Sequence, residues 1–267
     1  MNYFDYHLHT TESDGVLTPS QLLAELQAQQ IESFFITDHD HVCLWDGITA
    51  AGVELSCVWS NQLIHVVGLN LSLDQQAPIY QHCQGIALQR QLRGEKIAER
   101  LHKKGFSGAL QGALAYADGG MLCRPHFARW MVEQGHVKDI AQAFKKYLGP
   151  GKVGDVKAEW PHLTHAVDVI NASGGVAVLA HPKQYRMSNT KLKALMKDFR
   201  AAGGQAVEVC NGLQSSEEVA YLSQLTLQLE LLASAGSDFH GPATPYHQVG
   251  RFTALPQELT PVHTLWR

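Results

Sequence analysis

Histidines and carboxylates stand within or beside most of the strand-like segments of this 267-residue chain. The first such segment ends in His7-Leu8-His9, and Asp14 follows in the turn Glu12-Ser13-Asp14-Gly15. Alternate side chains of a strand point to the same face, so the two imidazoles share one side with Asp5. Two imidazoles spaced in this way can hold one metal ion. For this motif alone, the alternative is a half-buried strand whose polar side faces a cleft.

Five further apolar runs contain a candidate metal ligand or end at one: His39, Glu54, His65, His181, Asp238 and His240. Burying a charge or an unpaired imidazole is costly, so Glu54 and His65 require either a shared ion or a hydrogen-bonded core pair. Together with His7, His9 and Asp14, the set holds six histidines and three carboxylates, which is more than one ion takes. Mixed imidazole and carboxylate ligation without thiolate favours two or three ions of manganese, zinc or iron over calcium.

An alternation of strands and helices is predicted to position these residues. We expect strands over 4–9, 33–37, 52–56, 63–69, 174–180, 206–209 and 229–235. Thr18 before Pro19 predicts the start of the first helix. In a barrel of parallel strands, all strand ends converge on one rim, which is the usual place for an active site. The sequence therefore predicts an α/β fold with a single polar centre.

Residues 77–161 differ in character, because helical spacing replaces the strand-like runs. We interpret them as a helical insertion and not as a second independent domain. Residues 90–104 carry six Lys or Arg against two Glu, and a solvated helix face accounts for most of these charges. Arg90 and Arg93 share one face and could instead reach an anionic substrate. The loops 123–126 and 149–152 offer further cations.

Composition and charge narrow the possible functions. A formal net charge of -4 gives no general attraction to nucleic acid or to an anionic membrane. The five cysteines include no C-x-x-C pair, which favours reduced thiols in a cytosolic protein over a disulfide framework. No signal segment or long apolar run is present, so we expect a soluble, cytoplasmic protein. A dinucleotide fingerprint, a P-loop and a G-x-S-x-G motif are also missing from the sequence.

Five motifs in order resemble the motif series of the PHP (polymerase and histidinol phosphatase) family: 7–9, 37–39, 52–56, 180–182 and 236–240. The stretches 65–69, 122–128 and 147–149 are similar to the branch of 3',5'-nucleoside bisphosphate phosphatases, some of which are described as 5'-to-3' exoribonucleases on short RNA. The resemblance implies a distorted (β/α)7 barrel, formed by 1–76 and 162–267. The helical insertion 77–161 would cover the active site.

The resemblance also implies roles for individual residues. A first ion would be held by His7, His9, Glu54 and Asp238. A second would share Glu54 as a bridge and add His65 and His181. A third would be held by Asp14, His39 and His240. The substrate phosphates would be bound by Arg93, Arg124, Lys152 and His126. Asp5 would orient a ligand histidine, whereas Asp40 and His41 would be structural or solvent-facing.

The implied reaction is hydrolysis of the 3'-phosphate of a small nucleotide such as 3',5'-bisphosphoadenosine, with short RNA 5' ends as a further substrate. A metal-bound hydroxide held by Glu54, Asp238 and His181 would attack phosphorus in line with the ester oxygen. The sequence leaves open which residue protonates the leaving group. Neither a membrane nor an obligate protein partner is implied.

One segment departs from the branch pattern, since only the fourteen residues 40–53 separate His39 from Glu54. Part of the second helix, or the approach to the Glu54 strand, must therefore be missing or rebuilt. Trp45 and Asp46 could reorganise that edge of the barrel. We expect Glu54 still to reach the cluster. The alternatives are a histidinol phosphate phosphatase of the same family, a metal-dependent amidohydrolase, and a PHP module without enzymatic activity. The last would lack several ligands, whereas all nine positions are filled here.

Overall fold

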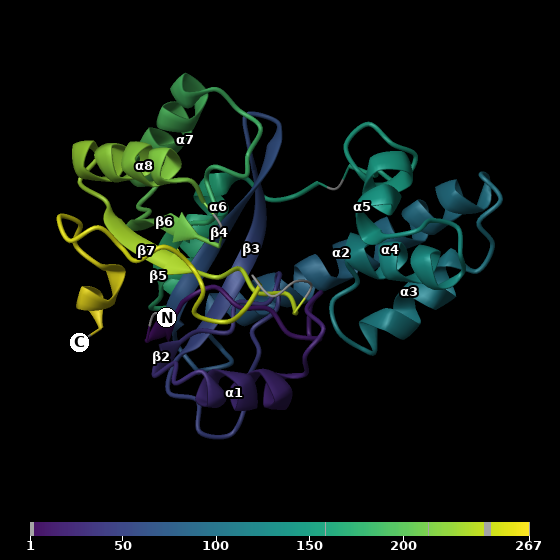
Figure 1. Ribbon diagram of the computed structural model, residues 1–267, viewed down its shortest axis with the longest axis horizontal. Helices are drawn as coiled ribbons and strands as arrows, with labels where there is room; N and C mark the ends of the chain where they lie inside the picture. The colour runs from purple at the N-terminus through teal and green to yellow at the C-terminus, as the bar shows by residue number, and fades with distance from the viewer. Residues whose placement is uncertain (1–2, 158, 213, 243–246, 267) are drawn as a thin grey trace.

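The computed structural model describes residues 3–157, 159–212, 214–242 and 247–266. Its strands are β1 (Phe4–Asp5), β2 (Ser33–Phe34), β3 (Ala51–Trp59), β4 (Gln62–Leu71), β5 (Val176–Leu179), β6 (Ala206–Asn211) and β7 (Leu232–Gly236). Its helices are α1 (Pro19–Ala28), α2 (Pro78–His102), α3 (Ala109–Ala117), α4 (Arg124–Glu133), α5 (Ile140–Ala143), the π-helical turn η1 (Phe144–Leu148), α6 (Leu163–Ala172), α7 (Asn189–Ala201), α8 (Ser216–Gln228) and the 3-10 turn η2 (Val262–Leu265). Figure 1 shows the strands with α6, α7 and α8 on one side and α2–α5 extending to the right.

Five strands form one mixed sheet in the order β3-β4-β5-β6-β7. β4 is antiparallel to both of its neighbours, whereas β5, β6 and β7 are parallel. Ser60 and Asn61, with φ of 48° and 59°, form the two-residue turn between β3 and β4, as tight hairpins require. The expectation of parallel strands that each end in a ligand was therefore wrong here. His65 lies within β4 and Glu54 within β3.

The remaining two strands, β1 and β2, form a separate parallel sheet. This pair meets the five-stranded sheet at two seams, made by the isolated bridges Leu8–Phe239 and His39–Glu54. The expected (β/α)7 barrel is not closed, because β1 and β2 join the five-stranded sheet through isolated bridges and a few backbone hydrogen bonds, without continuous strand pairing. The fold is a mixed α/β arrangement in which residues 7–9, 38–40 and 238–240 nevertheless meet.

Local sequence explains the segments that lead to this meeting point. The Thr18 side chain accepts from the backbone N–H of Gln21, and the Gln21 side chain accepts from the backbone N–H of Thr18, which confirms the predicted start of α1. The short segment 40–53 contains no helix among its residues, all of which the structure describes. Trp45 there stacks on Phe34 at 6.2 Å. The missing helix is thus replaced by a loop that leads directly into β3.

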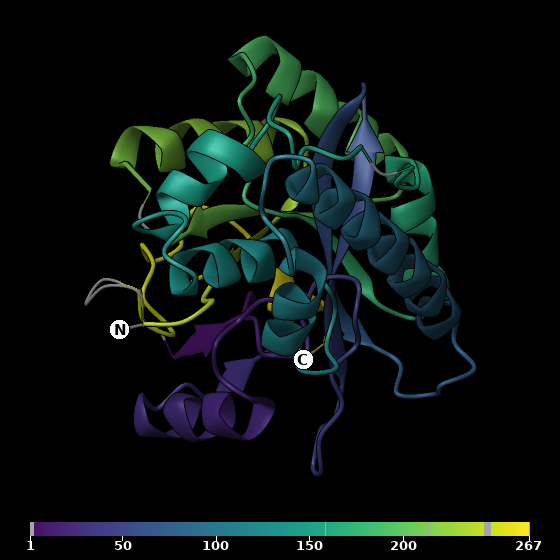
Figure 2. The same ribbon diagram turned by 90° about the vertical axis from the view of Figure 1, so that its right-hand side faces the viewer.

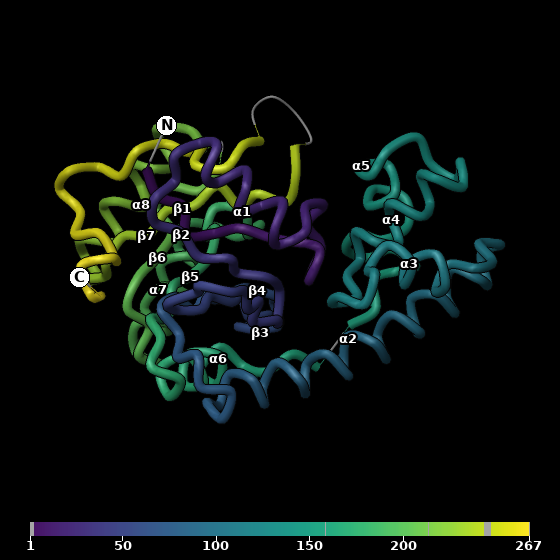
Figure 3. Tube along the Cα trace, turned by 90° about the horizontal axis from the view of Figure 1, so that it is seen from below, coloured from purple at the N-terminus to yellow at the C-terminus, as the bar shows by residue number. Residues whose placement is uncertain are grey.

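Helices α2–α5 have a hydrophobic core of their own, separate from the core of the five-stranded sheet. Figure 2 shows these helices in front of the sheet, and Figure 3 shows α2 running from beside α6 out to α3 and α4. Phe127 and Met131 of α4 are fully buried in this second core. No helix in the described part of the chain combines the length and the apolar character needed to cross a membrane.

Candidate metal centre

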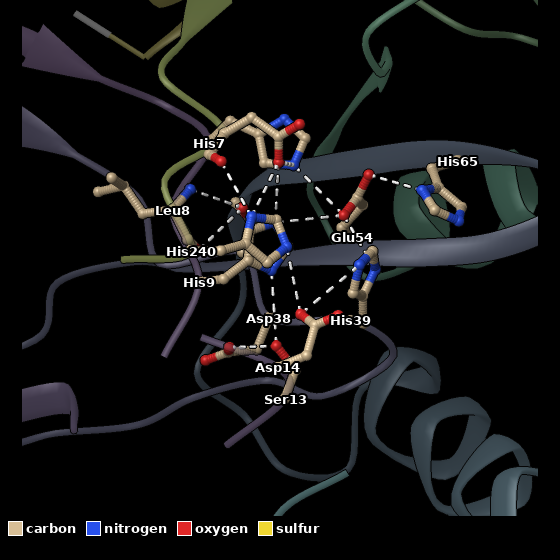
Figure 4. Close-up of polar contacts among 12 residues, drawn as sticks. His7, Leu8, His9, Ser13, Asp14, Asp38, His39, Glu54, His65 and His240 are labelled. Atoms are coloured by element: carbon tan, nitrogen blue, oxygen red, sulfur yellow. Dashed lines mark hydrogen bonds and ion pairs between the residues drawn. The ribbon is translucent and has the colours of Figure 1, made fainter. Parts of the chain in front are cut away.

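All nine predicted ligands lie together where the two sheets meet: His7, His9, Asp14, His39, Glu54, His65, His181, Asp238 and His240. Figure 4 shows most of their side chains directed toward a common centre around Glu54. They come from the segments that follow β1, β2, β5 and β7 and from the interior of β3 and β4. The Glu54 side chain is fully buried and contacts five of the histidines.

A first group consists of four atoms, one oxygen each from Glu54 and Asp238 and one ring nitrogen each from His7 and His9. The Nε2 atoms of His7 and His9 each lie 3.3 Å from Glu54 Oε2. The same two nitrogens lie 3.5 and 3.4 Å from Asp238 Oδ1. Ligand atoms about 2.0–2.2 Å from one ion in tetrahedral arrangement are separated by about 3.3–3.6 Å, so this group has the spacing of a metal site.

The other oxygen of Glu54 faces a second group. Glu54 Oε1 lies 2.9 Å from His65 Nδ1 and 2.8 Å from His181 Nε2. The two imidazole nitrogens are 3.3 Å apart. One carboxylate thus joins the two groups, as expected for a bridging ligand.

A third group gathers around Asp14. Its Oδ1 atom lies 3.2 Å from His240 Nε2 and 3.9 Å from His39 Nε2. His9 also has a ligand atom within reach of these three residues. Nδ1 of His39 lies 2.9 Å from Glu54 Oε2, so His39 stands between the groups.

Several buried atoms of the centre have no hydrogen-bond partner among the described residues: His7 Nε2, His9 Nε2, Asp14 Oδ1, His39 Nδ1, Glu54 Oε2 and His181 Nδ1. A buried polar atom without a partner is destabilising, and such atoms are rare in folded proteins. Five of the six belong to the first and third groups and face neighbouring ligand atoms. Bound divalent cations would satisfy these five atoms, so the residues present fit a metal centre.

The charges of the centre follow from its burial and its histidines. Burial alone would raise the pKa of Glu54, but His39, His65 and His7 hold it well below its usual range. Neighbouring histidines likewise hold the pKa values of Asp14 and Asp238 well below their usual range, so all three carboxylates are anionic at neutral pH. Burial also opposes a charge on His240, yet Asp14 raises the pKa of His240 to about 10. Without a cation, protons on histidines balance the carboxylates.

Glu208 is a contributor that the sequence reasoning did not assign. Its Oε1 lies 2.6 Å from His7 Nδ1, and its Oε2 accepts a 2.6 Å hydrogen bond from the backbone N–H of His181. A carboxylate on the far nitrogen fixes the orientation of a metal-binding imidazole. The sequence did contain a signal for this role, because Glu208 is a single charged residue in the apolar strand β6. The cost of burying such a charge is the argument that selected Glu54.

Asp5 supports the centre differently from what was expected. Its carboxylate accepts hydrogen bonds from the backbone N–H groups of His7, Ser237 and Gly250, at 3.3, 2.9 and 2.7 Å. Within the described residues it forms no hydrogen bond to the ring of a predicted ligand. Burial raises the pKa of Asp5 to about 6. Asp5 therefore stabilises the backbone next to predicted ligands on both sides of the seam between β1 and β7.

We expect Glu208→Gln to lower metal affinity and activity by about 10–100-fold, because the neutral amide raises the basicity of the His7 imidazole less and orients the ring less firmly than the carboxylate does. The check is the metal content per chain after dialysis, measured by elemental analysis beside turnover. Glu217→Gln, at an exposed position in the first turn of α8, is the matched control. Full metal content and activity in Glu208→Gln would contradict the positioning role.

The cationic residues considered as substrate contacts differ in their surroundings. Arg90 is wrong as a substrate contact, because its guanidinium is buried against Asp40, Ser56 and Cys123. Arg93 Nε donates to the Val156 carbonyl at 2.8 Å, and Arg124 Nη1 donates to the Leu148 carbonyl at 3.3 Å. Neither forms an ion pair within the described residues.

His126 and Lys152 complete the predicted set. His126 is buried, its Nδ1 accepts from the backbone N–H of Cys123 at 3.1 Å, and it also hydrogen-bonds the backbone of Ser13. Both interactions are internal and connect α4 to the Asp14 loop, and contact of His126 with a substrate stays a prediction. Lys152 is exposed in the loop after η1.

Arg129 was not anticipated and binds the same loop as His126. Its guanidinium donates to the carbonyls of Asp14 and Gly15, at 2.5 and 3.2 Å. From the other side, Asp38 accepts from the Thr10 backbone and from the Ser13 hydroxyl, at 2.7 and 2.6 Å. The loop that carries Asp14 is therefore held between the strands and helix α4.

Comparison with known proteins identifies close relatives. The chain is 41% identical to the 5'-3' exoribonuclease Rnm of Escherichia coli, over 98% of this chain and 93% of the relative. It is 36% identical to a 3',5'-nucleoside bisphosphate phosphatase of Chromobacterium violaceum, over 100% and 96% of the two chains. A solved structure from Chromobacterium violaceum, described as an amidohydrolase with bound sulfate and no metal, superimposes with a TM-score of 0.90 at 34% identity, covering 98% of this chain and 95% of the other. No protein-family model matches the chain.

Proposed function

The chain belongs to the PHP family, in the group of 5'-3' exoribonucleases and 3',5'-nucleoside bisphosphate phosphatases, and we propose on this premise that it removes the 3'-phosphate of a 3',5'-nucleoside bisphosphate. It is a hydrolase of phosphate esters. The observation that supports this substrate is the position of two guanidiniums, those of Arg93 and Arg124, which form no ion pair within the described residues and lie on helices beside the candidate metal centre. A cluster that binds one phosphate and cations that bind another match a substrate with two phosphates.

We propose two or three divalent ions, with manganese best suited to the mixture of imidazole and carboxylate ligands. Bound ions would supply a water of lowered pKa and positive charge beside the phosphoryl oxygens. Glu54 would bridge the first and second groups, because its two oxygens face different sets of histidines. Glu208 would hold His7 in the orientation that the first group requires.

Arg93 and Arg124 are the residues that we propose bind the 5'-phosphate, with Lys152 as an exposed third cation. Burial, together with the charges of Arg124 and Arg90, lowers the pKa of Arg93 to about 10. Neighbouring cations that repel one another attract a dianion strongly. On this proposal, residues 77–161 act as a helical insertion that covers the centre and supplies the second phosphate site.

The manganese-loaded protein is expected to release phosphate from 3',5'-bisphosphoadenosine faster than from histidinol phosphate or from adenosine 3'-monophosphate. In Arg124→Ala, we expect the KM for the bisphosphate to rise by about 10–100-fold, because a desolvated contact between Arg and phosphate is lost. The KM for the 3'-monophosphate should stay within about twofold, since that substrate lacks the 5'-phosphate.

Steady-state phosphate release measures both constants. Arg200→Ala is the matched control, because Arg200 pairs with Glu230 on the exposed side of α7. No release from the bisphosphate at high enzyme concentration would refute the proposed function. An equal rise of KM for both substrates would remove Arg124 from the 5'-phosphate site.

A further inference from the structure

We propose that the polar cavity between the loops after β5, β6 and β7 binds the nucleotide that follows the scissile phosphate of a 5'-phosphorylated RNA. The inference rests on the proposed phosphatase function and extends it from a mononucleotide to a short chain. The cavity measures about 240 Å³ and borders the metal centre at His181 and Asp238. Its other polar lining includes Lys183, Gln184, Asn211, Gln214, Gln248 and Arg251.

Removal of a 3'-phosphate and release of the first nucleotide from RNA break the same bond. In both cases the oxygen of water bonds to phosphorus, the O3'–P bond breaks, and O3' leaves as a hydroxyl with one proton. In the bisphosphate, the other phosphate oxygens are unsubstituted. In RNA, one of them carries O5' of the next nucleotide, which stays on phosphorus as the new 5'-phosphate. A centre that acts on RNA therefore needs one additional place, beside the ions, for that next nucleotide.

The cavity lies at the correct end of the centre for this purpose. Helices α2 and α4 reach the Asp14–His39 end, where Arg129 binds the Asp14 carbonyl and Arg90 binds Asp40. The first nucleotide would occupy that side, because its 5'-phosphate would lie on Arg93 and Arg124. The cavity adjoins the other end, at Asp238 and His181. A chain that continues past the scissile phosphate would enter it directly.

The wall of the cavity is a connected set of hydrogen bonds that begins at the centre. Gln184 Nε2 donates to Asp238 Oδ2 at 3.2 Å and to Asn211 Oδ1 at 2.9 Å. Asn211 in turn donates to Glu208 Oε2 at 3.2 Å. These side chains are thereby fixed, and a rigid polar wall suits selective binding because little side-chain freedom is lost.

Two groups of the lining are suited to a nucleotide. Gln214 uses its Oε1 atom to accept from the backbone N–H of Asn211 at 2.5 Å, and the amide nitrogen has no partner among the described residues. Side-chain amides bind the edges of unpaired bases. Lys183 donates to Asn189 Oδ1 at 3.2 Å, lies over the Tyr221 ring and forms no ion pair within the described residues, so its charge is available to a phosphate.

The size of the cavity also indicates an accessory site. Complete small-molecule sites usually enclose about 300–1,000 Å³, which exceeds the volume found here. A space of this size fits one base or one sugar. It is therefore suited to the continuation of a substrate whose reacting part is bound elsewhere.

The test compares 3',5'-bisphosphoadenosine with the 5'-phosphorylated dinucleotide pApA in the manganese-loaded, full-length protein. Lys183→Glu and Gln214→Glu each place a negative charge in the cavity. Within the described residues, neither Lys183 nor Gln214 forms a hydrogen bond to a predicted metal ligand. We expect the KM for pApA to rise by at least about tenfold in each variant, while kcat/KM for the bisphosphate stays within about twofold. Lys197→Glu, at an exposed position of α7, should change neither substrate.

Each outcome decides a different point. A selective loss on pApA supports the subsite. An equal loss on both substrates means that the cavity holds the first nucleotide, and an unchanged KM for pApA means that it holds no part of the chain; either result overturns the inference. Wild-type protein that hydrolyses the bisphosphate but not pApA overturns it as well and leaves the phosphatase function intact. Protein that hydrolyses neither overturns the proposed function itself.

Discussion

Glu54→Ala is expected to abolish phosphatase activity and to remove at least one bound ion. Glu54 is the single residue shared by the first two ligand groups: its Oε2 faces His7 and His9 at 3.3 Å, and its Oε1 faces His65 and His181 at 2.9 and 2.8 Å. Its loss leaves five imidazoles without their common anion. We expect kcat/KM for the bisphosphate to fall by at least about 10²–10³-fold, as for the loss of a central electrostatic group.

Elemental analysis of the dialysed protein measures the ions per chain, and phosphate release measures activity. Glu54→Gln keeps the shape of the side chain and removes only its charge, so it separates a loss of ligation from a loss of folding. Glu32→Ala, at an exposed position before β2, is the matched control. Unchanged metal content in both Glu54 variants would exclude this residue from the centre.

Arg90→Met is expected to have the largest effect on stability. Its Nε and Nη2 both donate to Asp40 Oδ2, at 2.8 and 2.5 Å, and Nη2 also donates to the Ser56 hydroxyl at 2.9 Å. Asp40 is fully buried, so the variant leaves its charge without a partner. Breaking a buried pair in this way costs about 3–5 kcal/mol of unfolding free energy.

Denaturant unfolding at neutral pH measures the loss, and a double-mutant cycle assigns it to the pair. Arg90→Met combined with Asp40→Asn should be less destabilising than the sum of the two single variants. Burial would raise the pKa of Asp40, but Arg90 holds it below its usual range. The contribution of the pair is therefore fully present at neutral pH and is lost as the pH falls through the lowered pKa. Additive single effects would contradict the coupling.

Most of the candidate ligands could be predicted from the sequence because they interrupt or follow an apolar run, whereas Asp14 lies in the polar turn after the first strand. His181 and Asp238 follow buried strands directly, and there the reasoning from strand ends was correct in position. Glu54 and His65 required a different argument, the cost of an isolated polar side chain in a buried strand. The same argument applied to Glu208, but no partner for it was evident before the long-range contact with His7 was known.

The strand topology was harder to predict from the sequence than the candidate ligands were. Ser60-Asn61 is a weak turn signal, and a strand's direction depends on that turn, so the antiparallel β4 was not predicted. Helix α8 was not predicted either, and the expected strand over 229–235 begins only at Leu232 because α8 and its cap occupy the preceding residues. The roles of Arg90 and Arg129 depend on contacts between segments far apart in the sequence, which periodicity within one helix cannot show.

The two seams have a consequence for the order of folding. The bridge between Leu8 and Phe239 joins segments separated by most of the chain, so its loop-closure entropy is large and its formation depends on prior assembly of the intervening strands. During synthesis, His7 and His9 leave the ribosome before Asp238 and His240, which lie more than 220 residues further along the chain. The candidate ligands on the two sides of this seam can therefore come together only after the intervening segments have been made. A chain that stops before residue 238 would keep the two histidines and lack their partners across the seam.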